Sequence, residues 1–205
     1  MKNRLCLLTL FASLVFAIAL PASAQILYSD GPINGETDAW TINDGFVVSD
    51  TFILFGNSRV TGMSFGAWLF PGDTLESVDV TFTHFEFGGT LYFNQVVSFT
   101  ASDCFVNNYG FDVCQETGFF NGVNLAAGTY WMNLQNAVVN TGDPVYWDEN
   151  SGPSSSSENG GTLPAESFSI LGSSSTAGTV PEPGSLLLLA GGAVGMAGIL
   201  RRKLR

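Results

Sequence analysis

Short runs of alternating apolar and polar residues, separated by turn signals, fill the middle of this 205-residue chain. In residues 77–85, Val78, Val80 and Phe82 fall on one face and polar residues fall between them. A two-residue period of this kind is typical of a strand with one buried face. We find no convincing helical period between residues 25 and 171, which indicates a domain built from strands.

Turn signals such as Asp-Gly, Asn-Gly and Pro-Gly separate the expected strands. These strands cover residues 46–54, 60–70, 77–85, 91–100, 119–125, 128–139, 145–147 and 166–171. Short strands at this spacing predict an all-β fold, an antiparallel β-sandwich of the jelly-roll type. The Ser-rich and Gly-rich segment 152–161 is expected to be a loop.

The first 24 residues are typical of a secretory signal peptide. Two basic residues precede the apolar run 5–20, and Ala22 and Ala24 form an Ala-x-Ala cleavage site before Gln25. We therefore expect export through the Sec translocon and cleavage by signal peptidase. An uncleaved N-terminal anchor is the alternative.

The segment between the two chain ends is strongly acidic. Residues 25–180 hold 17 Asp and Glu but only one Lys or Arg, Arg59, which gives a formal charge of −16. Such a surface repels nucleic acid and favours divalent cations. Nucleic-acid binding is therefore excluded as a function.

Cys104 and Cys114 remain after removal of the signal peptide, which takes Cys6 with it. An even pair of cysteines in an oxidising compartment favours a disulfide. We expect Cys104 and Cys114 to close a hairpin-like loop, and two free thiols are the alternative.

One loop-like segment gathers the side chains that best suit a ligand. Asp143, Asp148, Glu149 and Asn150 supply oxygen atoms of the kind that Ca²⁺ binds, although their spacing does not match an EF-hand. Trp147 lies among them and could stack on a sugar ring. The alternative is that Trp147 packs against the domain with solvated acids around it.

Trp131 is a second candidate for ligand binding. Alternation in residues 128–139 places it opposite Tyr130, so one of these two aromatic rings should face outward or toward a neighbouring loop. A strand buried on both faces would remove this surface role.

We predict no catalytic residues. The sequence has no nucleophile motif, zinc-spaced His pair or phosphate loop, and its one His, His84, is expected to continue the inward-facing series of its strand. A hydrolase that uses two carboxylates on a glycan is the enzymatic alternative. Seventeen acids would provide some such pair by chance, so this pattern is not specific.

The C-terminus combines three features in a fixed order. Pro181, Glu182 and Pro183 precede the uncharged apolar run 185–200, which predicts a single transmembrane helix. Four basic residues follow this run, and we expect them to stay in the cytoplasm: Arg201, Arg202, Lys203 and Arg205. An ordinary membrane anchor is one interpretation.

This tail resembles the PEP-CTERM sorting signal of Gram-negative bacteria. The resemblance implies recognition by an exosortase, a membrane protease, and cleavage near residues 181–183. It also implies an inner-membrane precursor that moves to the cell surface, outer envelope or extracellular matrix, in association with exopolysaccharide. A permanently anchored inner-membrane protein with a periplasmic domain is the alternative.

Together these features predict four parts. They are a signal peptide at 1–24, a β-sandwich domain at 25–171, a flexible linker at 172–180 and the sorting signal at 181–205. We expect a structural, adhesive or glycan-binding role for the exported protein.

Overall fold

The computed structural model describes residues 24–174, which form 13 strands and no helix. The strands are β1 (Gln25–Ser29), β2 (Ala39–Thr41), β3 (Val47–Leu54), β4 (Ser58–Leu69), β5 (Leu75–Phe85), β6 (Gly88–Val106), β7 (Asp112–Leu125), β8 (Gly128–Val139), β9 (Tyr146–Asn150), β10 (Ser156–Glu158), β11 (Gly161–Leu163), β12 (Ala165–Glu166) and β13 (Phe168–Ser174). The prediction of an all-β fold is confirmed. Most of the predicted signal peptide and the whole sorting signal lie outside the described residues.

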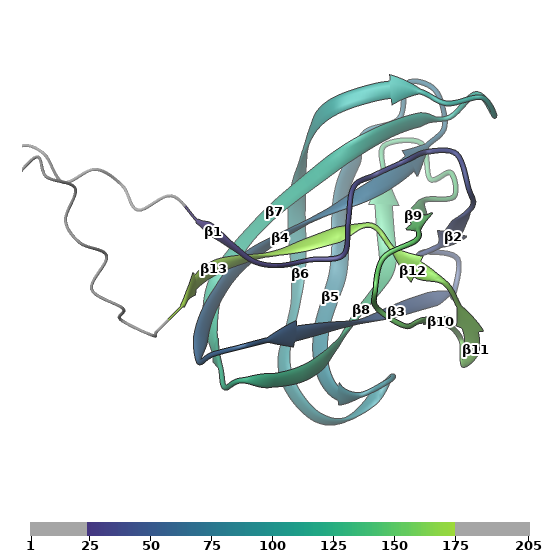
Figure 1. Ribbon diagram of the computed structural model, residues 1–205. Coiled ribbons are helices and arrows are strands. Elements are labelled where there is room, and N and C mark those ends of the chain that lie inside the picture. The colour runs from purple at the N-terminus through teal and green to yellow at the C-terminus, as the bar shows by residue number, and fades with distance from the viewer. Residues whose placement is uncertain (1–23, 175–205) are drawn as a thin grey trace, which may run out of the picture.

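The strands form one antiparallel sheet that curls into a sandwich-like fold (Figure 1). Their order is β1-β13-β4-β7-β6-β5-β8-β3-β10-β11, and β9 pairs with β2, β4 and β12. The long strand β6 belongs to both layers, because residues 88–98 pair with β5 and residues 99–106 pair with β7. The two layers are therefore continuous through β6, and the fold is a curled antiparallel sheet.

One hydrophobic core fills the space between the layers. It includes the residues whose inward position follows from alternation, among them Met63, Phe65, Val80, Phe82 and Leu134. Aromatic contacts extend across the core, as in the edge-to-face pair of Phe52 and Phe82 at 5.3 Å. The periodicity of the sequence thus predicted the buried face of the central strands.

The structure corrects three local expectations. His84 is exposed, because bulges on both sides of Thr83 interrupt the alternation of β5. The expected loop 152–161 contains β10, which pairs with β3 and β11. Strand β13 continues to Ser174, three residues beyond Leu171, so the expected linker begins within a strand.

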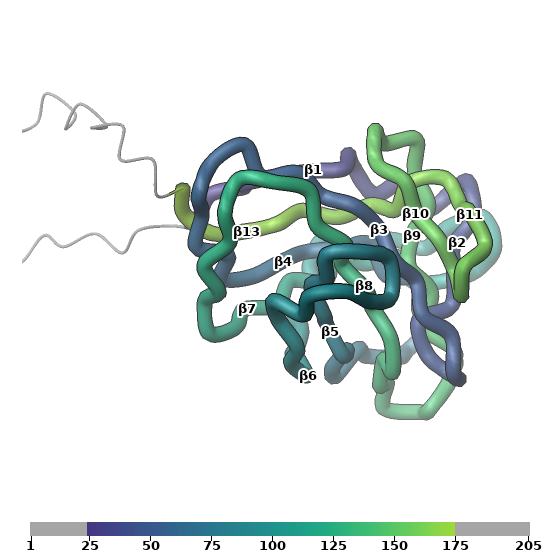
Figure 2. The backbone as a smooth tube through the Cα atoms, turned by 90° about the horizontal axis from the view of Figure 1, so that it is seen from below, coloured from purple at the N-terminus to yellow at the C-terminus, as the bar shows by residue number. Residues whose placement is uncertain are grey.

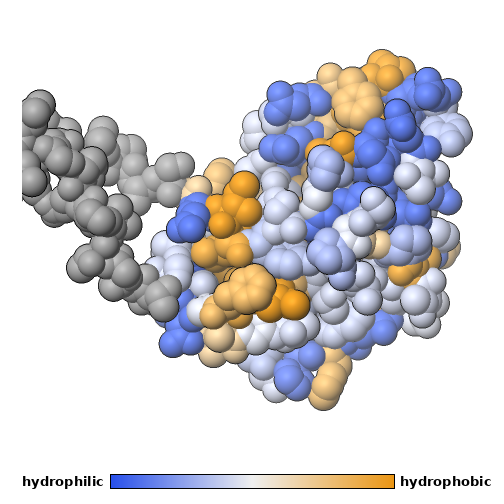
Figure 3. Space-filling model, in the orientation of Figure 1, coloured by the Kyte–Doolittle hydropathy of each residue, from blue (hydrophilic) through white to orange (hydrophobic). Residues whose placement is uncertain are grey.

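Both ends of the described chain emerge at the same end of the domain, because β1 and β13 are antiparallel neighbours with Gln25 opposite Gly172 (Figures 1 and 2). Cross-strand pairing aligns Ile26, Leu171, Gly62 and Phe119 in one row near this end. Figure 3 shows apolar surface gathered beside the departing chain, on an otherwise largely hydrophilic face.

No helix among residues 24–174 is long and apolar enough to cross a membrane. The predicted transmembrane run 185–200 lies beyond this part of the chain.

Candidate functional site: an aromatic cleft

A surface cleft of about 440 Å³ lies beside the C-terminal end of β4. Four aromatic residues line it, from segments far apart in the sequence: Trp68, Tyr109, Phe111 and Tyr146. Thr37, Asp38 and Ala39 complete the lining. We refer to this set of seven residues as the aromatic cleft.

Strand pairing positions two of the rings. Phe65, Ala67 and Leu69 on β4 face the core, so Trp68 between them faces the outer side of the sheet. Tyr146 at the start of β9 lies directly opposite Trp68 and shares this outer face.

The buried Asp148 carboxylate fixes the position of Trp68 in the cleft. One carboxylate oxygen accepts a hydrogen bond from the Trp68 indole N–H at 2.6 Å. The same carboxylate accepts the backbone N–H groups of Asn34 and Gly35, each at 2.9 Å. It therefore joins β4, β9 and the segment that leads to Thr37, Asp38 and Ala39.

The turn between β6 and β7 supplies the other two rings. Tyr109 stacks on Trp68 with ring centroids 5.7 Å apart, and Phe111 lies 5.8 Å from Trp68. The Asn107 side-chain oxygen accepts the backbone N–H groups of Tyr109 at 3.0 Å and Phe111 at 2.9 Å. Gly110 between them has φ +87°, a conformation that suits glycine.

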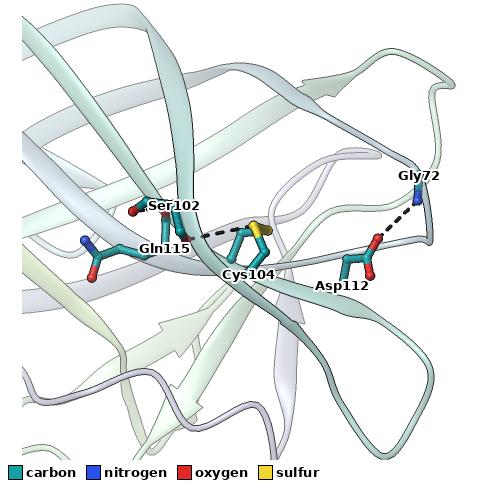
Figure 4. The surroundings of a disulfide bond; sticks show 6 residues. Gly72, Ser102, Cys104, Asp112 and Gln115 are labelled. Carbon is teal, nitrogen blue, oxygen red and sulfur yellow. Dashed lines mark hydrogen bonds between the residues drawn. A yellow bond between two sulfur atoms is a disulfide. The ribbon is translucent and has the colours of Figure 1, made fainter.

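The Cys104–Cys114 disulfide closes the base of this turn, as the sequence predicted (Figure 4). The two Cα atoms are 4.1 Å apart on the neighbouring strands β6 and β7. Asp112 lies next to the turn and accepts the Gly72 backbone N–H at 3.1 Å, which joins the turn to the end of β4 (Figure 4). The covalent bond and this hydrogen bond both fix the segment that carries Tyr109 and Phe111.

The segment before Thr37, Asp38 and Ala39 is held by close packing of Gly35 against the Phe105 ring. Gly35 has φ +64°, and a Cβ atom there would lie 2.9 Å from the Phe105 ring, so a larger residue would not fit without movement. The Tyr109 hydroxyl donates a hydrogen bond to the Glu36 carbonyl at 3.3 Å, which joins the β6–β7 turn to the segment before Thr37.

The electrostatic environment of the cleft is negative. Asp38 is exposed on its wall. The pKa of Tyr146 is raised by burial and by the negative charge of Asp44. Arg59, the one Lys or Arg among residues 24–174, lies against Gly122, near the other end of β4.

The structure does not bring the predicted metal ligands together. Asp148 bonds to the groups described above, Glu149 accepts the Trp40 indole N–H at 2.9 Å, and Asn150 donates to the Asp30 carbonyl at 2.8 Å. Asp143 lies outside β9, before Pro144, and is exposed. Within residues 24–174, no group of three or more His, Cys, Asp or Glu is placed to hold a metal ion. The arrangement therefore gives no support to a Ca²⁺ site at these four residues.

The two predicted ligand-binding tryptophans have different positions. Trp147 is 0% exposed, and its indole N–H donates to the Ser167 carbonyl at 2.9 Å, so the ligand hypothesis for Trp147 is corrected to a core role. Trp131 is half-buried on the outer face of β8, between Thr51 and Thr83. Tyr130 faces the core, so one ring of the pair does face outward, but Trp131 does not line the aromatic cleft.

A second groove, of about 590 Å³, crosses the outer face of β5 and β8. Its polar side chains bond to one another: the Asn133 amide N–H₂ donates to Thr81 at 2.9 Å and to Thr83 at 3.0 Å. Because these three side chains already bond to one another, this groove offers a ligand fewer free hydrogen-bonding groups than the aromatic cleft does.

Three further buried carboxyl groups do not line the cleft. Asp30, Asp50 and Glu166 are all 0% exposed. Burial raises the pKa of Asp50 to about 7, and burial together with the charge of Asp50 raises that of Glu166. Burial also raises the pKa of Glu116 to about 7, and neither of its carboxyl oxygens has a hydrogen-bond partner among the described residues.

Sequence reasoning missed Trp68, Tyr109 and Phe111. One available signal was that Tyr109 and Phe111 both lie within the short segment enclosed by Cys104 and Cys114. Rings on a cross-linked exposed turn are held in place without burial, which is typical of a binding surface.

Comparison with known proteins bears on the tail alone. A family model of the PEP-CTERM protein-sorting motif matches residues 179–203. This range contains Pro181, Glu182, Pro183, the apolar run and three of the four basic residues. A search of curated proteins found no significant match.

Proposed function

Because the chain carries a PEP-CTERM sorting motif and is therefore an exported substrate of the exosortase route, we propose that its β-domain binds glycans through the aromatic cleft. Its precursor is anchored in the membrane and directed to the cell surface. The proposal extends to the partner, which we infer to be exopolysaccharide or another envelope glycan.

The combination of ring faces and polar groups in one cleft is the observation that carries this proposal. Aromatic rings present large apolar faces at low conformational cost, and such faces pack against the C–H face of a pyranose ring. Thr37 and Asp38 add a hydroxyl and a carboxylate to the same lining, where they can bond to sugar hydroxyl groups.

The location of the cleft also supports the proposal. It lies at the Trp68 end of β4, whereas the described chain ends at Ser174, opposite Ser58 at the start of β4. Ten residues of strand separate these two ends, about 33 Å at 3.3 Å per residue. A domain tethered through its C-terminus would therefore present the cleft away from the tether.

We propose binding rather than catalysis. The carboxyl groups with the most strongly raised pKa are Asp50, Glu116 and Glu166, which are buried and out of reach of a polysaccharide. A strongly raised pKa suits a general acid, and the three carboxyl groups that have one are buried, which favours a non-catalytic role.

A glycan array followed by calorimetry tests the proposal on the full-length chain purified in detergent. We expect Tyr109→Ala to weaken binding about tenfold or more, a loss of about 1.4 kcal/mol, because a stacking face is removed. Phe119→Ala is the matched control, because Phe119 is 64% exposed, Tyr109 is 62% exposed, and Phe119 lies near the other end of the domain.

Two results would contradict the proposal. One is the absence of binding to any envelope polysaccharide, and the other is an equal loss in both variants. Release of shortened glycan products would instead favour the hydrolase alternative. For the tail, a protein that retains Arg205 in the inner membrane would favour permanent anchoring.

A further inference from the structure

We infer that the aromatic cleft selects glycans that carry protonated amino groups, such as de-N-acetylated hexosamine polymers, over neutral and acidic glycans. This inference rests on the proposed glycan-binding function and specifies the class of sugar.

The rings of the cleft form one aromatic cluster, in which Trp68 is 5% exposed and Tyr109 is 62% exposed. Phe111 is central to it, with its ring centroid 5.8 Å from that of Trp68 and 5.6 Å from that of Tyr146. Phe70 adds a further edge contact with Phe111 at 5.1 Å, and Tyr109 covers Trp68. The faces of such rings attract ammonium groups within about 6 Å of the ring centroid.

Carboxylate charge accompanies these rings. Asp38 lies on the cleft wall, and one of its oxygens accepts the Ala39 backbone N–H at 2.9 Å, a bond that fixes the carboxylate beside the opening. Asp44 is exposed and close enough to Tyr146 to raise its pKa, so a second negative charge acts on the same cleft. Ring faces and carboxylates together provide the two attractions that an ammonium group experiences most strongly.

No neighbouring cation offsets this charge within the described part of the chain. Arg59 is the one Lys or Arg between residues 24 and 174, and Gly122 beside its guanidinium belongs to the tether end of β7. A uronic acid would therefore meet carboxylates and no compensating positive group. A neutral sugar could stack on the rings and donate hydroxyl groups to Asp38, but it would gain no charge attraction from Asp38 or Asp44.

The test compares three oligosaccharides of equal length with the full-length chain in detergent, at about pH 6, where hexosamine amines are protonated. They are a glucosamine tetramer, an N-acetylglucosamine tetramer and a galacturonic acid tetramer. We expect the glucosamine tetramer to bind at least tenfold more tightly than its acetylated form, and the uronic acid to bind most weakly. Added salt should reduce the preference for glucosamine, because charge attraction is screened.

Asp38→Asn should reduce the glucosamine preference, measured as the ratio of the affinities for the glucosamine and acetylated tetramers, at least fivefold, because asparagine carries no charge. Asp79→Asn is the matched control, because Asp79 lies on the outer face of the other layer and its interaction with the Asn136 amide uses an oxygen that an asparagine retains. Asp44→Asn is a second test that preserves folding, because asparagine tolerates the positive φ of this position.

Equal or tighter binding of the acetylated tetramer would overturn the charge selection and leave glycan binding in place. An unchanged preference in both Asp38→Asn and Asp44→Asn would also overturn it. Failure of every glycan to bind would overturn the proposed function itself.

Discussion

The Tyr109 ring lies over the Trp68 ring, with centroids 5.7 Å apart and planes 23° from parallel, although 41 residues separate them in the sequence. Trp68 is fixed by the sheet, whereas Tyr109 belongs to an exposed turn. The Cys104–Cys114 disulfide and the Asn107 side chain determine where that turn lies. The cleft therefore depends on a cross-link that is not part of its lining.

Replacement of both cysteines by serine should destabilise the domain by about 2–3 kcal/mol, the chain-entropy value for a loop of this length. Glycan affinity should also fall in the folded protein, because the turn that carries Tyr109 becomes less restricted. Urea unfolding gives the first quantity and calorimetry gives the second. Unchanged affinity in the folded variant would show that the hydrogen bonds of Asn107 and Asp112 hold the turn without the disulfide.

Glu116→Gln should stabilise the protein at about pH 8. Glu116 is buried with no hydrogen-bond partner among the described residues, and its pKa is raised to about 7, so its ionised form carries an unoffset desolvation cost. We expect a gain of roughly 1–3 kcal/mol in the free energy of unfolding. The exposed Glu76→Gln should change it by less than about 0.5 kcal/mol. A loss of stability in Glu116→Gln would refute this account.

The free energy of unfolding should fall as the pH rises from about 4 to about 8. Asp50, Glu116 and Glu166 keep their protons in the folded state after the unfolded chain, with carboxyl pKa values near 4, has lost them. The unfolded state binds fewer protons over this interval, so stability decreases with pH and then levels off above the folded pKa values. Urea midpoints at a series of pH values measure the trend.

Asp50→Asn should make this pH dependence shallower, because it removes one of the shifted groups. Asp79→Asn also removes one carboxyl group and provides a control for general repulsion between the many carboxylates. If the free energy of unfolding has the same slope against pH in the two variants, the trend arises from overall charge and not from Asp50.

Gly35→Ala should destabilise the protein by about 1–3 kcal/mol, because alanine is strained at φ +64° and its Cβ would meet the Phe105 ring. Glycan affinity should fall as well. The hydrogen bond from the Gly35 backbone N–H to Asp148 positions the segment that carries Asp38, and a shift of Gly35 would move that segment. Gly72→Ala is a suitable control: it shares a positive φ but has open space around its Cβ position. The difference between the stability losses of Gly35→Ala and Gly72→Ala measures the cost of the contact with Phe105.

Intact mass of the protein recovered from its native host tests the processing route. We expect a species that begins at Gln25, ends near Pro181–Pro183 and has a mass two hydrogens below that of the reduced chain. Recovery outside the inner membrane would support sorting. A species that still ends at Arg205 and remains in the inner membrane would contradict cleavage of the tail.

The sequence predicted strands best where alternation extends over their whole length. Residues 128–139 were expected as a strand, and β8 has the same bounds. Strand β6 was expected at 91–100 but runs from Gly88 to Val106, because its final residues are largely exposed and owe their extended form to pairing with β7. Local pattern cannot report such pairing, since the partner strand supplies the hydrogen bonds.

The aromatic cleft was less accessible to prediction for a related reason. Acidic residues surround Trp147 in the sequence, which suggested a ligand site. Successive side chains of β9 point to opposite faces, however, and Trp147 enters the core. Trp68, Tyr109 and Tyr146 become neighbours only when β4 pairs with β9 and the β6–β7 turn folds over them. Their proximity is a property of the topology and not of any single segment.

The antiparallel arrangement of β1, β13 and β4 has a mechanical consequence. A glycan pulled from the cleft and a tether attached after Ser174 would load β13 along its length, since β13 runs from the cleft end of β4 toward its start. The hydrogen bonds that join β13 to β1 and β4 would then bear the force together in shear instead of opening one by one. We expect the domain to resist extension in this direction more than when it is pulled across its strands.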